Sequence, residues 1–390
     1  MAINRLCLGQ PGNSTRMLEA KVDEILLSLL RGSCLDQENA VLTEETLRAF
    51  TNLWQSGSCQ YALTQQYSQS LIAAIKKHYK ESEVAEAAVS AVDTLCHNNP
   101  DNAESVLIAG GGIVMIAIMR TFITDEKKIS DCLKVLWNVI AAAMESMDAK
   151  GNDDDEHEQG NVKLVNSIGL FNKAVVDAMR AHPTSPDIAE IGCDMVTILA
   201  DDNLPNATLL ARAGVGDVLS GVLRTHRDDA AVVERCVQSL VYLSQLDDEE
   251  VKTALGNAGV CEEVVATAKA HLNDSKLLAD GINAMYHLCF DHPANRAKVL
   301  EAQGAEGLLI VLRTYRGNNA DNVVAEAIEG VAHLFAEDDQ AAKGRLGAMG
   351  FCEAIVSAMQ ACPDDSVQEN GADTMTKLCE GHAENQQRGW

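Results

Sequence analysis

The sequence has few of the residues that build β-sheets. Aromatic residues make up 4% of its 390 residues, and runs of β-branched side chains are scarce. Strands are enriched in these two kinds of side chain, so their scarcity excludes a sheet-rich fold. The hydrophobic share of 47% is enough for a packed core, which excludes a disordered chain. We therefore expect a folded protein made of helices.

Basic charge is also in short supply. The chain has 31 Lys and Arg against 57 Asp and Glu, a net charge of −26. Such a surface repels nucleic-acid backbones and anionic membranes, and no apolar run reaches the length of a membrane span. We expect protein partners, among them partners with basic segments, no nucleic acid and no membrane insertion. The same charge is equally consistent with a surface that serves only solubility.

No two of the twelve cysteines have the C-x-x-C spacing, which excludes a zinc knuckle and a thioredoxin motif. Isolated thiols are typical of a reducing compartment, and the residues from Met1 to Asn4 do not begin a signal peptide. The cytoplasm is therefore the expected location. Isolated cysteines in predicted helices usually behave as small buried hydrophobic residues, and here these include Cys96, Cys132, Cys193, Cys236, Cys289 and Cys379.

A glycine recurs after a short apolar stretch at nearly constant spacing. The intervals are 45, 45, 45 and 46 residues between Gly169, Gly214, Gly259, Gly304 and Gly350. Gly110 stands 59 residues before the first of these, and the excess falls on an acidic stretch from Gly151 to Gly160. A fixed period of this length indicates a repeat architecture.

Two further markers keep the same register. A basic residue closes the helix after each glycine except Gly350, where Gln360 takes the place, and a cation there meets unpaired carbonyl groups. These residues are Arg120, Arg180, Arg224, Lys269 and Arg313. A leucine follows late in the next helix, at Leu53, Leu95, Leu199, Leu243, Leu288, Leu334 and Leu378. Three markers in one register predict a repeated structural unit.

Each unit is expected to contain three helices. In one of them, a short first helix over 205–213 ends at Gly214, because glycine readily takes the left-handed conformation that ends a helix. A second helix follows over 217–227. Asp228 and Asp229 then cap a longer third helix that runs to Leu246.

This pattern resembles the armadillo repeat. The resemblance covers the chain from about Leu18 to Trp390 and implies an all-α, right-handed superhelical solenoid of about eight three-helix repeats. It divides the chain into an N-terminal tail of residues 1–17 and a single solenoid of residues 18–390. The solenoid has an acidic insertion at about 148–160.

No motif in the sequence indicates catalysis. The clusters Gly110–Gly112 and Gly214–Gly216 lie at helix breaks and follow no predicted strand, which a dinucleotide fingerprint requires. The acidic stretch lacks the central glycine of a calcium-binding loop. We expect no catalytic residue, no metal ligand and no cofactor. His287 and His333 occupy the same place in consecutive repeats; they are either a pH-responsive or metal-binding pair or plain polar groove residues.

The resemblance also implies a groove lined by the third helices that holds an extended segment of a partner. In the nuclear-import adaptors of this family, asparagines before the leucine marker grip the peptide backbone, and tryptophans four residues earlier hold basic side chains. Only Asn52 and Asn138 match here, and no tryptophan does. The tail also lacks their basic segment, so an import adaptor is not expected, and neither is the continuous basic groove of the β-catenin-like proteins. The candidate partner-binding residues are Arg48, Asn52, Lys134, Asn138, Asp194, Gln238, Tyr242, Asn283, His287, Glu329, His333, Asp373 and Lys377.

Three functions follow from this reading. We favour a protein–protein interaction scaffold or adaptor that binds through the groove, or a subunit of a larger assembly. The alternative is a regulator of a GTPase or an Hsp70-type ATPase, acting as a nucleotide-exchange factor or co-chaperone. The third is an enzyme with an unrecognised site. An armadillo fold serves both of the first two classes, so fold alone does not separate them.

Overall fold

The computed structural model describes residues 11–32, 39–55, 65–150, 170–315 and 321–388, and this part of the chain contains 23 helices and no strand. The all-α class is therefore confirmed. The chain divides into two compact units, residues 1–195 and 196–390. Gly169, the stretch from Gly151 to Gly160 and Trp390 lie outside the described residues.

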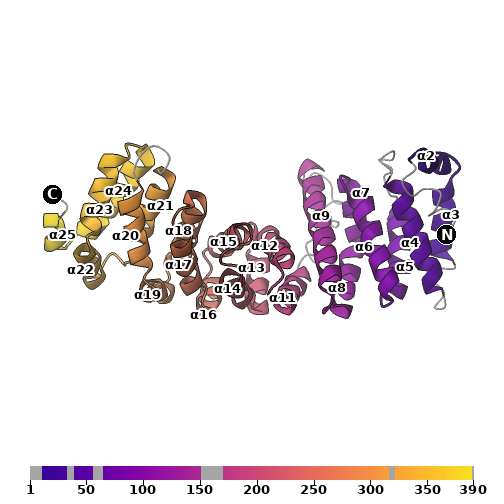
Figure 1. Ribbon diagram of the computed structural model, residues 1–390, viewed down its shortest axis with the longest axis horizontal. Coiled ribbons are helices and arrows are strands. Elements are labelled where there is room, and N and C mark those ends of the chain that lie inside the picture. Colours follow the sequence, from indigo (N-terminus) through magenta and orange to yellow (C-terminus); the bar gives the residue numbers. More distant parts are fainter. Residues whose placement is uncertain (1–10, 33–38, 56–64, 151–169, 316–320, 389–390) are drawn as a thin grey trace. The chain divides into compact units, whose positions relative to one another are not determined.

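The described part of the N-terminal unit begins with α2 and ends within α12 (Figure 1). In chain order its helices are α2 (Pro11–Glu19), α3 (Val22–Arg31), α4 (Ala40–Trp54), α5 (Gln65–His78), α6 (Ser82–Cys96), α7 (Pro100–Ile108), α8 (Gly111–Thr121), α9 (Glu126–Lys150), α11 (Phe171–Ala181) and α12 (Pro186–Ala200). Helices α4, α6, α9 and α12 are the third helices of their repeats. Within the unit α4 packs on α6 and α6 packs on α9.

The C-terminal unit repeats the three-helix pattern more regularly. Its helices are α13 (Leu204–Ala213), α14 (Val215–Thr225), α15 (Ala230–Ser244), α16 (Glu249–Asn257), α17 (Val260–Ala270), α18 (Ser275–Cys289), α19 (Pro293–Glu301), α20 (Gly304–Thr314), α21 (Asp321–Ala332), α22 (Gln340–Met349), α23 (Phe351–Ala361), α24 (Asp365–Cys379) and α25 (Ala383–Arg388). The third helices α15, α18, α21 and α24 stack in that order, and the second helices α14, α17, α20 and α23 do the same.

Local sequence chemistry explains the boundaries of these helices. Gly214 has φ 84°, in the left-handed region, and separates α13 from α14 as predicted. The carboxylate of Asp229 accepts hydrogen bonds from the backbone N–H groups of Ala231 and Val232, which caps α15. Along α15 the apolar stripe that includes Cys236 and Leu240 is fully buried. The predicted repeat unit is therefore confirmed in its helices, its glycine and its cap.

The glycine marker is wrong at one position. Gln303, with φ 65°, occupies the left-handed position between α19 and α20, and Gly304 is the first residue of α20. The requirement at Gly304 is space rather than backbone conformation, because an added Cβ would lie 2.5 Å from Cγ1 of Val299. Gly111 meets Val106 in the same way in the N-terminal unit. The left-handed position and the first residue of the second helix are adjacent, so a glycine at either one gives nearly the same sequence spacing.

The third helix α21 ends earlier than predicted. It ends at Ala332, so His333 and the marker Leu334 lie in the turn that follows, whereas α15, α18 and α24 each end one residue after their leucine marker. Gly330 lies in the last turn of α21, and glycine is about 1 kcal/mol less favourable than alanine inside a helix. Its lack of a side chain also lets Ile282 of α18 approach to 3.2 Å from where a Cβ would lie.

Described helices overlap the ends of the predicted tail and of the predicted insertion, whose bounds stay predictions. Residues 11–19 form α2, which packs on α3 and α4 with Ser14 fully buried. Residues 148–150 belong to α9, so the acidic stretch begins after Lys150. The single solenoid over 18–390 stays a prediction, since the two units are separate compact bodies.

Candidate functional site

A cavity of about 420 Å³ lies among the third helices α4, α6 and α9 of the N-terminal unit. Three of the predicted partner-binding residues, Arg48, Lys134 and Asn138, line it together. The remaining lining is Ala85, Glu86, Val89, Ser90, Asp93, Ile118, Lys127, Lys128, Asp131 and Val135. The cavity therefore joins polar and charged side chains from three consecutive repeats.

Helix periodicity places the polar lining of α9 on one face. Lys127, Asp131, Lys134 and Asn138 follow the spacing i, i+4, i+7 and i+11, which keeps side chains on one side of a helix. The opposite face carries the buried apolar residues that hold α9 in the stack, among them Leu133. On α6 the same rule aligns Glu86, Ser90 and Asp93. Burial of one face thus points the other into the cavity.

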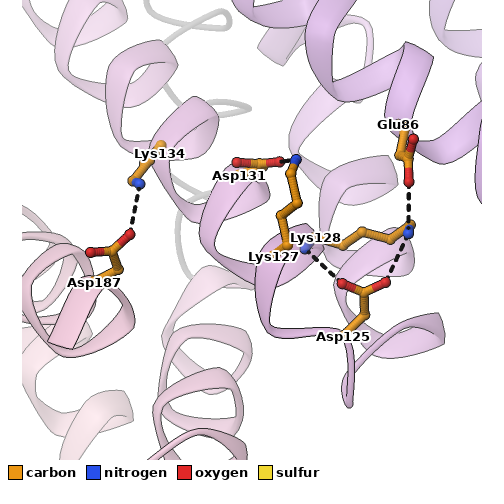
Figure 2. A network of polar contacts seen from close by, with 7 residues as sticks. All are labelled: Glu86, Asp125, Lys127, Lys128, Asp131, Lys134 and Asp187. Carbon is orange, nitrogen blue, oxygen red and sulfur yellow. Dashed lines mark hydrogen bonds and ion pairs between the residues drawn. The ribbon is translucent and has the colours of Figure 1, made fainter. Parts of the chain in front are cut away.

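Lys128 is the central cation of this network (Figure 2). Its Nζ lies 2.8 Å from a carboxylate oxygen of Asp125 and 2.9 Å from one of Glu86, and its side chain is only 12% exposed. Hydrogen bonds to these two carboxylates raise the pKa of Lys128, and the bond to Lys128 in turn lowers the pKa of Asp125. Lys128 therefore ties the start of α9 to α6 and has a structural role.

The other cations of the cavity are more accessible. Lys127 is 82% exposed and pairs with Asp131 on its own helix at 2.6 Å; hydrogen bonding to that carboxylate raises its pKa. Lys134 lies 3.3 Å from Asp187 of α12. Exposed ion pairs of this kind contribute about 0–1 kcal/mol, so an incoming carboxylate can replace the present partner at little cost. Arg48 is similarly placed, with Glu44 at 2.8 Å.

The remaining predicted site residues lie on the expected helices but outside this cavity. All thirteen are exposed or half-buried, and twelve lie within third helices. The exception is His333, which follows the end of α21. In the C-terminal unit Lys377 pairs with Asp373 at 2.8 Å, and Glu329 accepts a hydrogen bond from Asn370 at 3.4 Å. No observation tests whether these residues touch a partner, so that role stays a prediction.

The sequence-based prediction missed the first two turns of α9. It considered only two positions of each third helix, the one before the leucine marker and the one four residues earlier. Asp131 and Lys127 lie one and two turns before Lys134 along the same face. Extending the i, i+4, i+7 rule towards the helix start would have found them. The link between Lys128 and Glu86 has no local signal, because 42 residues separate the two in the sequence.

The two predicted histidines meet around one aromatic ring in the C-terminal unit. The ring centre of Tyr286 lies 4.6 Å from that of His287 and 4.3 Å from that of His333, and Phe290 lies 5.6 Å from His333. Burial, with the nearby cations Lys377 and Arg296, lowers the pKa of His333 to about 4. Burial also lowers the pKa of His287. Both imidazoles are therefore neutral at pH 7.

These pKa shifts predict that acid destabilises the C-terminal unit through His333. The unfolded chain, with a histidine pKa near 6.5, binds this proton more readily than the folded one. The stability that neutral His333 contributes to the folded state is thus complete above about pH 6.5, and it is lost as the pH falls towards 4. Because solvent screens a half-buried ring, we expect about 1–2 kcal/mol. The measurement is urea unfolding of wild type and His333→Gln at pH 7 and pH 4.5.

Comparing wild type with the His333→Gln variant separates the effect of His333 from that of other acid-sensitive groups. Burial raises the pKa values of Asp280 and Glu326, so their protonation favours the folded state as the pH falls, in the opposite direction. These groups are common to wild type and variant. A stability difference between the two that does not change with pH would contradict the prediction.

Outside these two regions, the described residues show few features of another kind of site. No group of three or more His, Cys, Asp or Glu side chains is placed to hold a metal ion. Among the described helices, none is by itself long and apolar enough to cross a membrane, and only α7 and α8 taken together, bent by 72°, have the length and composition of one. The cysteines singled out in the sequence are buried, except Cys379, which is half-buried.

Comparison with known proteins identifies the fold. No family model and no curated protein matches the chain. A structure from a study of the phosphorylation switch that controls the interaction between cadherin and β-catenin matches with a TM-score of 0.67 and 17% identity, covering 93% of this chain and 62% of that one. An engineered protein matches with a TM-score of 0.54 and 18% identity, covering 97% and 93%. A designed armadillo repeat protein in complex with the peptide (KR)4 matches over 60% of this chain and 98% of its own, with 16% identity and a TM-score of 0.45.

These likenesses concern the fold, because the sequence identities are below 20%. The chain spans less than two thirds of the protein from the cadherin and β-catenin study. Together with the three-helix units described above, the two matches with TM-scores above 0.5 define the fold as an armadillo-type helical repeat solenoid.

Proposed function

We propose that this protein is a protein-binding scaffold or adaptor whose N-terminal unit holds a segment of a partner in the cavity among α4, α6 and α9. The observation that supports this most directly is the convergence of Arg48, Lys134 and Asn138 on one cavity of about 420 Å³. A volume of that size admits several side chains of a bound segment. The comparisons offer no support for the alternative of a GTPase or Hsp70 regulator.

The chemistry of the lining favours an extended segment. Asn138 and Ser90 offer amide and hydroxyl groups, and the charged side chains around them add donors and acceptors. An extended backbone leaves its own N–H and C=O groups unpaired, so it needs such partners. The amide of Asn138 now donates to Asp93 at 3.4 Å, a long bond that a peptide carbonyl can replace.

The charge of the lining favours an acidic side chain in that segment. The lining has four cationic and three carboxylate side chains in a chain whose net charge is −26. Glu44, Asp125 and Asp187 beside the lining pair with three of these cations, so the place is close to neutral rather than positive. A carboxylate is therefore less strongly repelled here than on the rest of this acidic surface. The net charge also suggests a partner with basic segments, which stays a prediction for other surfaces of the protein. A cytoplasmic location likewise stays a prediction.

The experiment is site-specific photocrosslinking in the cells that make the protein. A photoreactive amino acid at the exposed position Ser90 reports what occupies the cavity, and one at Lys173 of α11 reports general surface contacts. We expect position 90 to capture one main protein through an acidic stretch. Capture of the same proteins at both positions would refute a specific site.

A charge reversal then measures the contribution of the cations. The double substitution Lys127→Glu and Lys134→Glu should lower the affinity for the captured segment roughly tenfold to a hundredfold, because two attractions become repulsions. Lys173→Glu is the matched control, since Lys173 also forms an exposed pair four residues along its own helix, with Asp177 at 2.8 Å. Fluorescence anisotropy of the labelled segment gives the affinities. An equal loss in the control would assign the effect to net charge alone.

A further inference from the structure

Two of the four junctions between successive first helices in the C-terminal unit, α16–α19 and α22–α25, share one kind of contact. Asn295 of α19 donates to the backbone carbonyl of Lys252 on α16 at 2.9 Å, and Asn385 of α25 donates to that of Lys343 on α22 at 2.9 Å. Each asparagine is the third residue of its helix.

A glycine faces each of these asparagines. An added Cβ on Gly256 would lie 1.8 Å from Oδ1 of Asn295, and one on Gly347 would lie 1.8 Å from Oδ1 of Asn385. No side chain fits into so small a gap. The glycine and the asparagine therefore act as a pair that draws two first helices together.

Both members of the pair are replaced where α22 follows α19. Leu300 stands on α19 where Gly256 and Gly347 stand on their helices, three residues before the left-handed residue. Ala342 is the third residue of α22 and has no side-chain amide to donate to the preceding helix.

At the α13–α16 junction both members are also replaced, by the small Ala211 and by Val251, and those helices still pack on each other. What sets α19 apart is the larger Leu300, which holds the next helix away, while Ala342 has no side chain that could draw it in. A cavity of about 430 Å³ lies at this place, lined by both helices.

The walls of this cleft are apolar and its rim is charged. Leu300, Ala305, Leu346 and Met349 line it, and the early end of α21 adds Leu334 to the same lining. Its charged groups are the exposed Glu301, Glu306 and Arg345, which make no ion pair with other described residues. An apolar slot with two free carboxylates beside it has the features of a docking surface.

We propose that the cleft between α19 and α22 binds an amphipathic helix of a partner protein, with its apolar face inward and Lys or Arg side chains opposite Glu301 and Glu306. The lining contains no amide and no hydroxyl side chain, so an extended segment would leave its backbone groups unpaired there. A helix satisfies its own backbone and needs only apolar contact from the groove. This surface is separate from the cavity among α4, α6 and α9, and the inference does not depend on the proposed function.

A second copy of this chain fits the cleft less well. Its net charge of −26 disfavours approach to an acidic rim, and a stable dimer needs on the order of 1,200–2,000 Å² of buried surface. A slot that takes a few side chains suits a single helix. The charge of the occupant is thus opposite to that of the protein as a whole.

The test uses a fluorescent peptide of two heptads with leucines at i, i+3, i+4 and i+7 and lysines flanking them. A second peptide has glutamates in place of the lysines. In anisotropy titrations the full-length protein should prefer the lysine peptide. Glu301→Lys with Glu306→Lys should weaken the lysine peptide roughly tenfold and strengthen the glutamate peptide. Glu262→Lys, at the position equivalent to Glu306 one repeat earlier and also without an ion pair, should change neither.

A second variant closes the cleft itself. Leu300→Gly with Ala342→Asn rebuilds the glycine–asparagine pair at α19 and α22 and should abolish binding of the lysine peptide while circular dichroism stays that of a folded helical protein. Unchanged peptide affinity in the rim variant would overturn the proposal. So would sedimentation showing a dimer of wild type that the Glu301→Lys, Glu306→Lys variant loses, because the occupant would then be a second copy.

Discussion

Replacing Leu240 by alanine should lower the free energy of unfolding of the C-terminal unit by about 2–5 kcal/mol, since it removes a buried aliphatic side chain and leaves a cavity. Leu240 lies in the middle of α15 and is 0% exposed. Urea unfolding followed by circular dichroism measures the change, and hydrogen exchange of peptides from α14 to α17 shows where it acts.

Leu209→Ala is the matched control for this substitution. Leu209 lies on α13 in the same unit, and its side chain is 43% exposed. Its removal should change the stability by less than about 0.5 kcal/mol, because little apolar surface is buried there. Equal effects of the two substitutions would mean that the stripe of α15 is not the core of its repeat.

The second large effect is expected at Asn295. Its amide donates to the carbonyl groups of Lys252 and Leu288 at 2.9 and 3.1 Å, and the side chain is 1% exposed. Asn295→Ala leaves both carbonyl groups buried without this donor, which should cost about 2–4 kcal/mol. Urea unfolding measures the loss, and faster hydrogen exchange should appear in α16 and α19 together.

Asn322→Ala is the control, because Asn322 is an exposed residue of α21 and its substitution should be nearly neutral. A small effect at Asn295 as well would show that apolar packing alone holds the first helices together. The glycine–asparagine pair would then not explain why the cleft opens where it is absent.

Much of the fold could be predicted because its signals are local. The left-handed glycine at Gly214, the cap at Asp229 and the apolar stripe around Leu240 each depend on neighbours within a few residues. The error at Gly304 has the same origin. The repeat spacing locates a glycine to within one residue. It does not say whether the glycine is there for a left-handed backbone or for close packing, and at Gly304 the close packing comes from Val299 and Val265.

Part of the candidate site could also be predicted, because the direction of side chains along one helix is a local property. Third-helix periodicity placed Arg48, Lys134 and Asn138 on one surface, and the structure brings these three to one cavity. Periodicity within one helix could not show that Glu86 holds Lys128, because that ion pair joins two different repeats. Nor does periodicity say that α21 ends before His333.

The helical class, the three-helix repeat and the buried faces follow from local patterns, because periodicity, caps and left-handed residues act over one or two helical turns. Which side chains meet between repeats depends on how the folded repeats pack together. Asn295 and Lys252 stand 43 residues apart. The side chains that each repeat presents to the next decide the outcome. They tie two helices together at Asn295 and Lys252, and they leave a cleft at Leu300 and Ala342.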